Sequence, residues 1–423
     1  MIFRSHKAYL YMKQKNTEET QEKIDIENQI NLKILDAILE DDEEQFSELI
    51  SENIQDPSKC NKSFFNTNYK IPNILTGNPT YASLCAFFCA EKCFTTLSLF
   101  LPDGTSSEEM KKLDDYKRSP IHFACIGGSL NILRELHQAM FDINARDESG
   151  YFPSHYAAMA GHFDVIKYLW TKGADLTSPS YDNRMTPLQV ACFYGNLDIV
   201  KFICETVITN PSQNSEKDHI ESKLNRTFDF LRNFLSIGKE PTPLHYACKG
   251  GHDNIVKYFL TKPELINLQI NSLDKNSRNP LLCACHNGSL NCVKALLEGA
   301  GDKIKLNMKG RKHLPLVDAA SGGYLDIVQF LIKQKQIKIQ QETSENISAL
   351  HAAVLNDHLN FVKLLIQNGA AKDLPKDNIG HIFFSALKIE NFELISYLDK
   401  TLEIPYKEKY QVEQTTKKSN FHY

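Results

Sequence analysis

The 423-residue sequence lacks several features that would place it at a membrane or on a nucleic acid. No run approaches the ~18 consecutive apolar residues that span a bilayer. Residues 1–16 have no continuous apolar core, which argues against a signal peptide. The formal net charge of −4 is close to balanced, so no basic excess points to a phosphate backbone. We therefore expect no membrane insertion and no nucleic-acid partner.

Motifs for enzyme or metal chemistry are also missing. The chain has no G-x-x-x-x-G-K-[ST] phosphate loop and no G-x-G-x-x-G turn. It has no H-E-x-x-H and no C-x-x-C pair. One possible metal cluster consists of Cys283, Cys285, His286 and Cys292. However, Cys283 and Cys285 are two residues apart on a predicted helix, so their side chains point to different sides. We expect no catalytic residue, no metal site and no cofactor. A degenerate hydrolase or transferase would need a titratable cluster in a deep pocket.

The eleven cysteines occur mostly at apolar positions of helical patterns. Such cysteines behave as small buried hydrophobes and persist as thiols in a reducing compartment. Cys85, Cys89 and Cys93 share one helical stripe, which we interpret as part of a core rather than as a ligand set. The cytoplasm is the expected location, with the nucleus as the alternative.

What the sequence does contain is a repeated unit. Its clearest copy, residues 147–176, reads DESGYFPSHYAAMAGHFDVIKYLWTKGADL and combines two short helical patterns separated by Gly161-His162. The proline position recurs at residues 120, 153, 187, 243, 280, 315 and 349, the last an alanine, so the spacings are 33, 34, 56, 37, 35 and 34. Helices this short are marginal alone in water, so neighbouring units must cover each other's apolar sides.

Most units also carry signals for where the first helix begins and ends. A residue suited to the N-cap usually precedes the proline position, although Phe152 and Leu314 replace it in two units. Glycine usually follows the helix, where a left-handed backbone is needed. The predicted N-caps are Ser119, Thr186, Thr242, Asn279 and Ser348. Four units have a histidine two residues after the proline position. In the other three this residue is Gln189, Leu282 or Val317, and we expect those units to be locally weaker.

The T-P-L-H-x-A and G-H motifs resemble those of the ankyrin-repeat family, over about residues 115–400. The resemblance implies an all-α solenoid of stacked helix-turn-helix repeats with short β-hairpin loops. It also implies that the motif histidines form hydrogen bonds between neighbouring loops and hold the units in register, rather than serving catalysis. These histidines are His122, His155, His245 and His351.

The pattern divides the chain into six segments. Residues 80–100 form a divergent repeat in which Cys89 occupies the glycine position. The irregular spacing after Pro187 marks an insertion with an amphipathic stripe over residues 220–237. The predicted segments are a polar arm (1–30), divergent capping repeats (31–113), repeats (114–205), the insertion (206–240), repeats with a C-terminal cap (241–400) and a polar tail (401–423).

The stacked arrangement offers a surface for a protein or peptide. Hairpin tips and the exposed sides of the first helices are expected to line a concave face, and aromatic residues and arginine anchor protein interfaces. The expected binding residues are Phe123, Tyr151, Tyr156, Met159, Tyr181, Arg184, Met185, Phe193, Tyr194, Tyr246 and Lys249. Several of them could instead pack against the adjacent repeat.

Two functions remain open at this point. The first is a non-enzymatic interaction module, a scaffold or adaptor that acts as a monomer. The second is a regulatory or inhibitory subunit of an enzyme, which works through the insertion at residues 206–240. The sequence selects no particular partner or pathway for either function.

Overall fold

The computed structural model describes residues 26–53, 75, 77–101, 104, 108, 110–209, 235, 241–306, 312–372, 374 and 376–402. The chain divides into two compact units, residues 1–217 and 218–423. We call them the N-terminal unit and the C-terminal unit and describe each by itself. Both consist of helices joined by turns, and the described residues include no β-strand.

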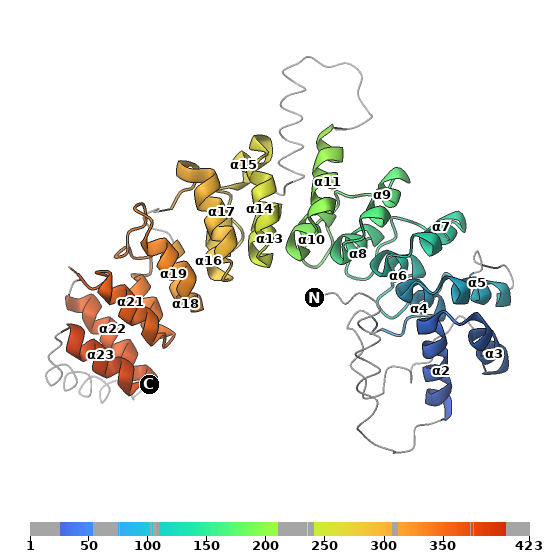
Figure 1. Ribbon diagram of the computed structural model, residues 1–423, viewed down its shortest axis with the longest axis horizontal. Helices are drawn as coiled ribbons and strands as arrows, with labels where there is room; N and C mark the ends of the chain where they lie inside the picture. Colours follow the sequence, from blue (N-terminus) through green and yellow to red (C-terminus); the bar gives the residue numbers. More distant parts are fainter. Residues whose placement is uncertain are drawn as a thin grey trace, which may run out of the picture. The chain divides into compact units, whose positions relative to one another are not determined.

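The described residues of the N-terminal unit form five helical pairs. The first member of each pair packs on the first member of the next, from α4 through α6 and α8 to α10 (Figure 1). The helices are α2 (Ile26–Glu40), α3 (Glu43–Asn53), α4 (Tyr81–Phe88), α5 (Glu91–Phe100), α6 (Pro120–Gly127), α7 (Leu130–Gln138), α8 (Pro153–Ala160), α9 (Phe163–Thr171), α10 (Pro187–Tyr194) and α11 (Leu197–Thr209).

The C-terminal unit follows the same plan, with α13, α16, α18, α20 and α22 packed in succession. Its helices are α13 (Pro243–Gly250), α14 (Asp253–Leu260), α15 (Pro263–Gln269), α16 (Pro280–His286), α17 (Leu290–Ala300), η4 (Gly301–Lys303), α18 (Pro315–Gly322), α19 (Leu325–Ile332), α20 (Ala349–Leu355), α21 (Leu359–Gln367), α22 (Lys376–Ile389) and α23 (Phe392–Leu402).

The predicted start and stop signals of the first helices are present. Proline is the first helical residue of α6, α8, α10, α13, α16 and α18. The Asn279 side chain accepts a hydrogen bond from the Leu282 backbone at 2.9 Å, as an N-cap should. Gly161 ends α8 with φ 86°, and Cys89 ends α4 in the same left-handed region with φ 60°. The divergent repeat therefore keeps the geometry of the regular ones, with cysteine in place of glycine.

Two helices add detail that the sequence prediction lacked. The first helix of the C-terminal cap, α22, begins at Lys376, the residue after Pro375 in the sequence. The short helix α15 was not anticipated. Its buried Gln269 accepts a hydrogen bond from the Leu244 backbone at 2.9 Å and so ties α15 to the start of α13. The predicted insertion helix at residues 220–237 falls outside the described residues, apart from Leu235.

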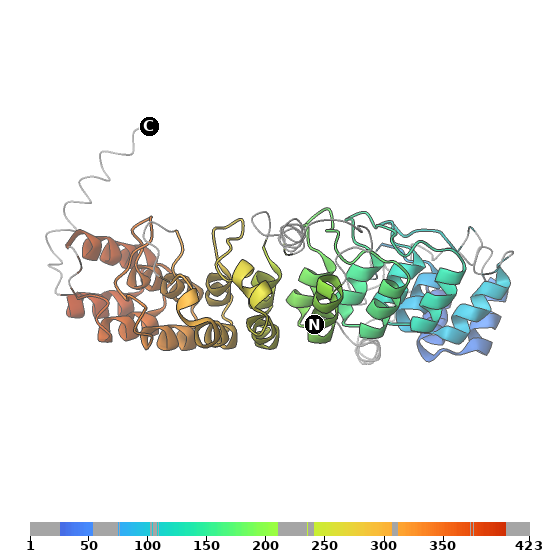
Figure 2. The same cartoon turned by 90° about the horizontal axis from the view of Figure 1, so that it is seen from above.

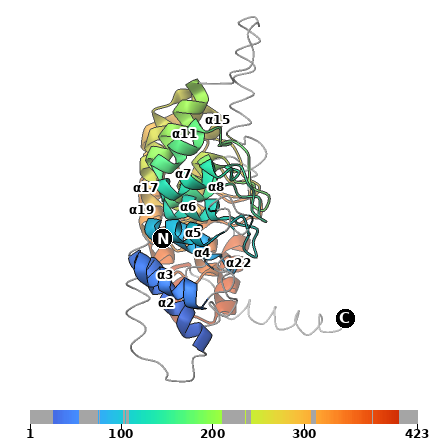
Figure 3. The same ribbon diagram turned by 90° about the vertical axis from the view of Figure 1, so that its right-hand side faces the viewer.

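The loops between repeats project from one side of the helical layers within each unit (Figures 2 and 3). The expected β-hairpins appear as tight turns without a strand ladder. In one of them the Asp147 backbone donates to the Tyr151 carbonyl at 3.1 Å. Neighbouring turns are joined by single backbone hydrogen bonds, from Glu148 to Tyr116 at 2.9 Å and from Tyr181 to Ser149 at 2.8 Å. We call the outer residues of these turns the tips.

Close packing of the first helices depends on small side chains, and Gly127 tests this. A Cβ atom at Gly127 would lie 2.3 Å from the Phe87 carbonyl oxygen and 2.7 Å from that of Ala86, on α4. We expect Gly127→Ala to lower the free energy of unfolding by about 1–3 kcal/mol, because backbone atoms must move apart. Chemical denaturation monitored by circular dichroism measures the change.

Gly322→Ala is the matched control, because Gly322 also ends its first helix. There the new Cβ would meet the side-chain ring of Tyr324 rather than backbone atoms. The control should lose less stability than Gly127→Ala. Equal losses in both variants would contradict the packing argument.

Candidate functional site

The motif histidines occupy buried structural positions. His122, His155 and His245 each accept, through Nδ1, a hydrogen bond from the backbone N–H that precedes their helix, at 3.0–3.1 Å. The Nε2 atoms lie 2.9–3.2 Å from the carbonyl oxygens of the next repeat's loop. An accepting Nδ1 leaves the proton on Nε2, which therefore donates to that carbonyl. The expected hydrogen bonds between neighbouring repeats are confirmed for these three histidines. The fourth, His351, differs, because its Nε2 lies 3.1 Å from the Ser385 hydroxyl on α22 rather than from a loop carbonyl.

The charge state of these histidines agrees with that role. Burial lowers the pKa of His122, His155 and His245 to about 4, so each is neutral at pH 7. At residue 189 a glutamine replaces the histidine, and its Oε1 accepts from the Thr186 backbone at 2.7 Å. The glutamine thus reproduces the bond within the repeat that the histidine makes elsewhere.

Aspartates close the turns and connect them to the first helices. Asp147 accepts from the Tyr151 backbone at 2.7 Å through one carboxylate oxygen and from the Tyr156 hydroxyl through the other. Asp114 occupies the same position in the preceding turn, and its carboxylate pairs with the guanidinium of Arg118. This guanidinium lies 4.8 Å from the Phe123 ring centroid. The residue after the motif histidine therefore faces this buried polar contact.

Three expected binding residues are consequently buried. Phe123 is 1% exposed, Tyr156 6% and Met185 8%, although the sequence analysis expected them at the surface. Phe123 lies under Arg118, Tyr156 donates to Asp147, and the Met185 carbonyl receives the His155 bond. The alternative, that they pack within and between the repeats, describes them better. The sequence pattern placed Phe123 and Tyr156 on first helices and Met185 in a turn, but it could not show that these segments fold against one another.

Six of the expected residues lie at the surface of the N-terminal unit, and five of these are aromatic or apolar. Tyr181 is 62% exposed, Phe193 39% and Tyr194 37%, and Tyr151 and Met159 are half-buried. The Phe193 and Tyr194 rings meet edge to face at 5.3 Å, and the Tyr151 hydroxyl accepts from Asn183 at 2.5 Å. We call Tyr151, Met159, Tyr181, Phe193 and Tyr194 the aromatic surface. They come from two successive turns and from the adjacent helices α8 and α10.

Three expected residues remain: Arg184, Tyr246 and Lys249. Arg184 is exposed in the turn before α10, with φ 54°. Tyr246 and Lys249 belong to the C-terminal unit, on α13, and both are half-buried. The Lys249 ammonium lies 3.3 Å from the Asp274 carboxylate and 5.5 Å from the Tyr246 ring centroid.

Comparison with known families identifies the architecture. The family model described as ankyrin repeats in three copies matches residues 84–180, 142–215, 175–264, 219–309, 300–376 and 316–400, which together cover well over half of the chain. The chain belongs to the ankyrin-repeat family. Ankyrin repeats generally mediate protein–protein interaction, and the ankyrin fold is typically non-enzymatic.

Individual relatives match only a part of the chain. Alpha-latrocrustotoxin-Lt1a from Latrodectus tredecimguttatus is 28% identical over 189 residues, 45% of this chain and 12% of the toxin. Transient receptor potential cation channel subfamily A member 1 from Drosophila melanogaster is 29% identical over 236 residues, 54% of this chain and 18% of the channel. The chain therefore spans less than a fifth of the length of either protein.

A solved ankyrin structure shows a similar partial match. The crystal structure of the human ASB11 ankyrin repeat domain covers 61% of this chain and 100% of its own, with a TM-score of 0.44 and 22% sequence identity.

Side-chain amides of asparagine residues form hydrogen bonds between neighbouring loops, which the sequence analysis did not predict. Asn144 donates to the Gly173 carbonyl at 3.4 Å and accepts from the Asp175 backbone at 2.8 Å. Asn271 repeats this arrangement in the C-terminal unit. Each asparagine stands three residues before the aspartate of its turn, a periodic signal that the sequence did contain.

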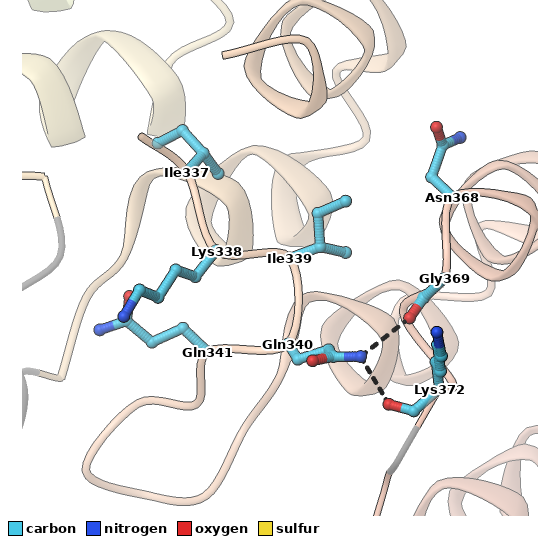
Figure 4. A pocket seen from close by; sticks show the side chains of 8 residues that line it. All are labelled: Ile337, Lys338, Ile339, Gln340, Gln341, Asn368, Gly369 and Lys372. Carbon is cyan, nitrogen blue, oxygen red and sulfur yellow. Dashed lines mark hydrogen bonds between the residues drawn. The ribbon is translucent and has the colours of Figure 1, made fainter. Parts of the chain in front are cut away.

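Gln340 occupies the same position in a later loop and borders a pocket of about 600 Å³ (Figure 4). Its amide donates to the carbonyls of Gly369 at 3.1 Å and Lys372 at 2.5 Å. The lining consists of Ile337, Lys338, Ile339, Gln340, Gln341, Asn368, Gly369 and Lys372. It includes no carboxylate, thiol or histidine, and its ionisable side chains are Lys338 and Lys372.

The cysteines of the described ranges add no candidate metal or reactive-thiol site. Nine of the ten cysteines in the described part of the chain are buried, and all ten are free. Burial raises the pKa of Cys283 to about 12, so the thiol stays protonated at neutral pH. No group of three potential ligands in the described ranges is arranged for a metal ion. Among the helices of these ranges, none combines the length and apolar character needed to cross a membrane.

The buried histidines predict a pH dependence of stability. The unfolded chain takes up protons near the ordinary histidine pKa of about 6.5, whereas the folded pKa is about 4. Stability from this source is complete above pH 6.5 and is lost as the pH falls toward 4, with a slope of about 1.4 kcal/mol per pH unit per histidine. Denaturant unfolding at pH 7 and pH 5 should show the loss.

His155→Gln isolates this effect, because carboxylates contribute equally to both proteins. The variant should lose less stability between pH 7 and pH 5 than the wild type. An identical pH dependence in the two proteins would show that His155 does not titrate as its burial requires.

The Tyr156 hydroxyl is expected to contribute to stability rather than to binding. Tyr156→Phe removes the donor to the buried Asp147 carboxylate, and we expect a loss of about 1–3 kcal/mol in the free energy of unfolding. Tyr194→Phe is the control, because that tyrosine is partly exposed, and its stability should change little. If Tyr156→Phe unfolds like the wild type, the buried hydrogen bond carries no net stability.

Proposed function

We propose that this protein is a non-enzymatic interaction module, a scaffold or adaptor, that binds a protein or peptide on the aromatic surface of its N-terminal unit. The observation that carries the proposal is the exposure of Tyr181, Phe193 and Tyr194 on adjoining turns and helices. Aromatic side chains of this kind supply large contact area and dominate the energy of many interfaces.

The surface is also held in place before a partner arrives. The Tyr181 ring lies over Gly150, where an added Cβ would come within 2.5 Å of it, and the Tyr181 backbone is tied to Ser149. Asn183 holds the Tyr151 hydroxyl from the neighbouring turn. Rigid side chains lose little conformational freedom on binding, which favours affinity.

Only some of the residues expected from the sequence belong to the proposed binding surface. Arg184 stands in the turn beside Tyr181 and supplies a polar contact at its edge. Tyr246 and Lys249 form a separate candidate contact on the C-terminal unit. Phe123, Tyr156 and Met185 are removed from the proposed surface because they are buried. The alternative of a regulatory subunit acting through residues 206–240 rests mainly on residues outside the described part of the chain, and no observation favours it.

The test is affinity capture from native extract with three forms of the full chain. The surface variant carries Tyr181→Ser, Phe193→Ser and Tyr194→Ser. The control carries Leu99→Ser and Met140→Ser, which alter residues 79% and 85% exposed outside the aromatic surface. Circular dichroism and denaturation first establish that all three forms are folded.

We expect a specific protein to be captured by the wild type and the control and to be lost from the surface variant. Loss of two or three aromatic anchors commonly weakens an interface by more than 2 kcal/mol, or about thirtyfold. Capture of the same proteins by all three forms would overturn the proposed surface.

A further inference from the structure

The repeats of α8 and α13 carry different chemistry at equivalent positions. The first residue after the aspartate of the turn is Glu148 before α8 and Lys275 before α13. The residue four positions after the motif histidine is Met159 on α8, whereas it is Lys249 on α13. The repeat of α8 thus carries an acidic and an apolar residue where the repeat of α13 carries two lysines.

Two acidic side chains lie beside the aromatic surface. Glu148 and Asp182 are exposed, on the turns before α8 and α10, and neither forms an ion pair with another residue of the described ranges. Asp182 directly follows Tyr181, and the backbone bond from Tyr181 to Ser149 brings the turn of Glu148 alongside. The nearby cations are Lys117, on the preceding tip, Arg184, two residues after Asp182, and Arg146, which donates to the carbonyls of Gly150 and Pro179.

Rings on these turns already bind guanidinium groups within the protein. Arg146 lies between two of them, 4.1 Å from the Phe152 centroid and 4.7 Å from that of Tyr181. Arg118 is placed in the same way, 5.1 Å from the centroid of Tyr116. Such contacts combine electrostatic attraction to the ring face with stacking of a planar cation. Tyr181 remains 62% exposed and Tyr194 37% exposed, so ring surface is left for a partner.

We propose that the segment bound on the aromatic surface is basic and apolar, with an arginine or lysine placed against the ring of Tyr181 or Tyr194. That cation pairs with Glu148 and Asp182, while apolar side chains of the same segment pack on Met159 and Phe193. The inference rests on the proposed function and names the chemistry of its partner. Acidic or uncharged segments leave the two carboxylates without a counter-charge.

A random dodecamer peptide library displayed on phage supplies the probe, selected on the immobilised full-length chain. We expect the enriched peptides to contain arginine or lysine close to aromatic or aliphatic residues. Synthetic copies of the enriched peptides are then measured by fluorescence anisotropy. Binding should weaken as salt is raised, because the charges lie at the surface.

Three variants of the chain interpret the result. Glu148→Gln with Asp182→Asn removes the proposed counter-charges, and we expect binding about three- to tenfold weaker, typical of two exposed ion pairs. Asp164→Asn with Asp198→Asn is the control, because both aspartates are exposed in the first turns of α9 and α11. The Tyr181→Ser, Phe193→Ser, Tyr194→Ser variant reports whether the peptide occupies the aromatic surface at all.

Each outcome decides a separate claim. Basic peptides that lose affinity with both the acid-neutralised and the aromatic variants, and not with the control, support the inference. Peptides that need the aromatic residues but contain no basic residue, or bind equally after neutralisation, overturn the partner chemistry and leave the proposed function intact. A selection that returns no peptide dependent on the aromatic residues overturns both.

Discussion

Burial of one repeat against the next is the constraint on which this structure depends. First helices such as α6 and α8 have eight residues each, too few for independent stability, and their apolar sides are buried by the helices before and after them. Stability is therefore a property of neighbouring pairs rather than of single units. The backbone contact at Gly127 shows how close this approach becomes, because even one methyl group would meet the carbonyl oxygens of α4.

Several of the buried polar side chains join one repeat to the next. The imidazole of His155 joins the start of its own helix to the loop of the next repeat, and Asn144 joins neighbouring loops in the same way. Asp147 closes its turn and accepts from Tyr156 below it. These contacts use side chains that elsewhere serve catalysis, but here burial keeps the histidines neutral and the tyrosine protonated.

A binding surface arises where this internal network stops. Tyr156 and Tyr194 are both tyrosines of the first helices, yet one lies under a turn while the other is more than a third exposed. The difference comes from their positions along the helix, near its beginning and at its end. Side chains near the beginning are covered by the folded turn, whereas those at the end reach the surface. The N-terminal unit places aromatic residues at these uncovered positions and leaves acids on the adjoining turns.

The sequence by itself determined the repeat, because periodic prolines, caps and glycines act over a few residues. It located the starts of six helices and the left-handed position of Cys89, and the resemblance to ankyrin repeats implied the bridging role of His122, His155 and His245. The helix α15 and the exposure of each aromatic residue were decided only by tertiary structure. Phe123 and Phe193 show why: both are aromatic residues of a first helix, but Arg118 and its turn cover only Phe123. Exposure depends on how each turn folds back over its helix, which the periodic pattern of residue types does not record.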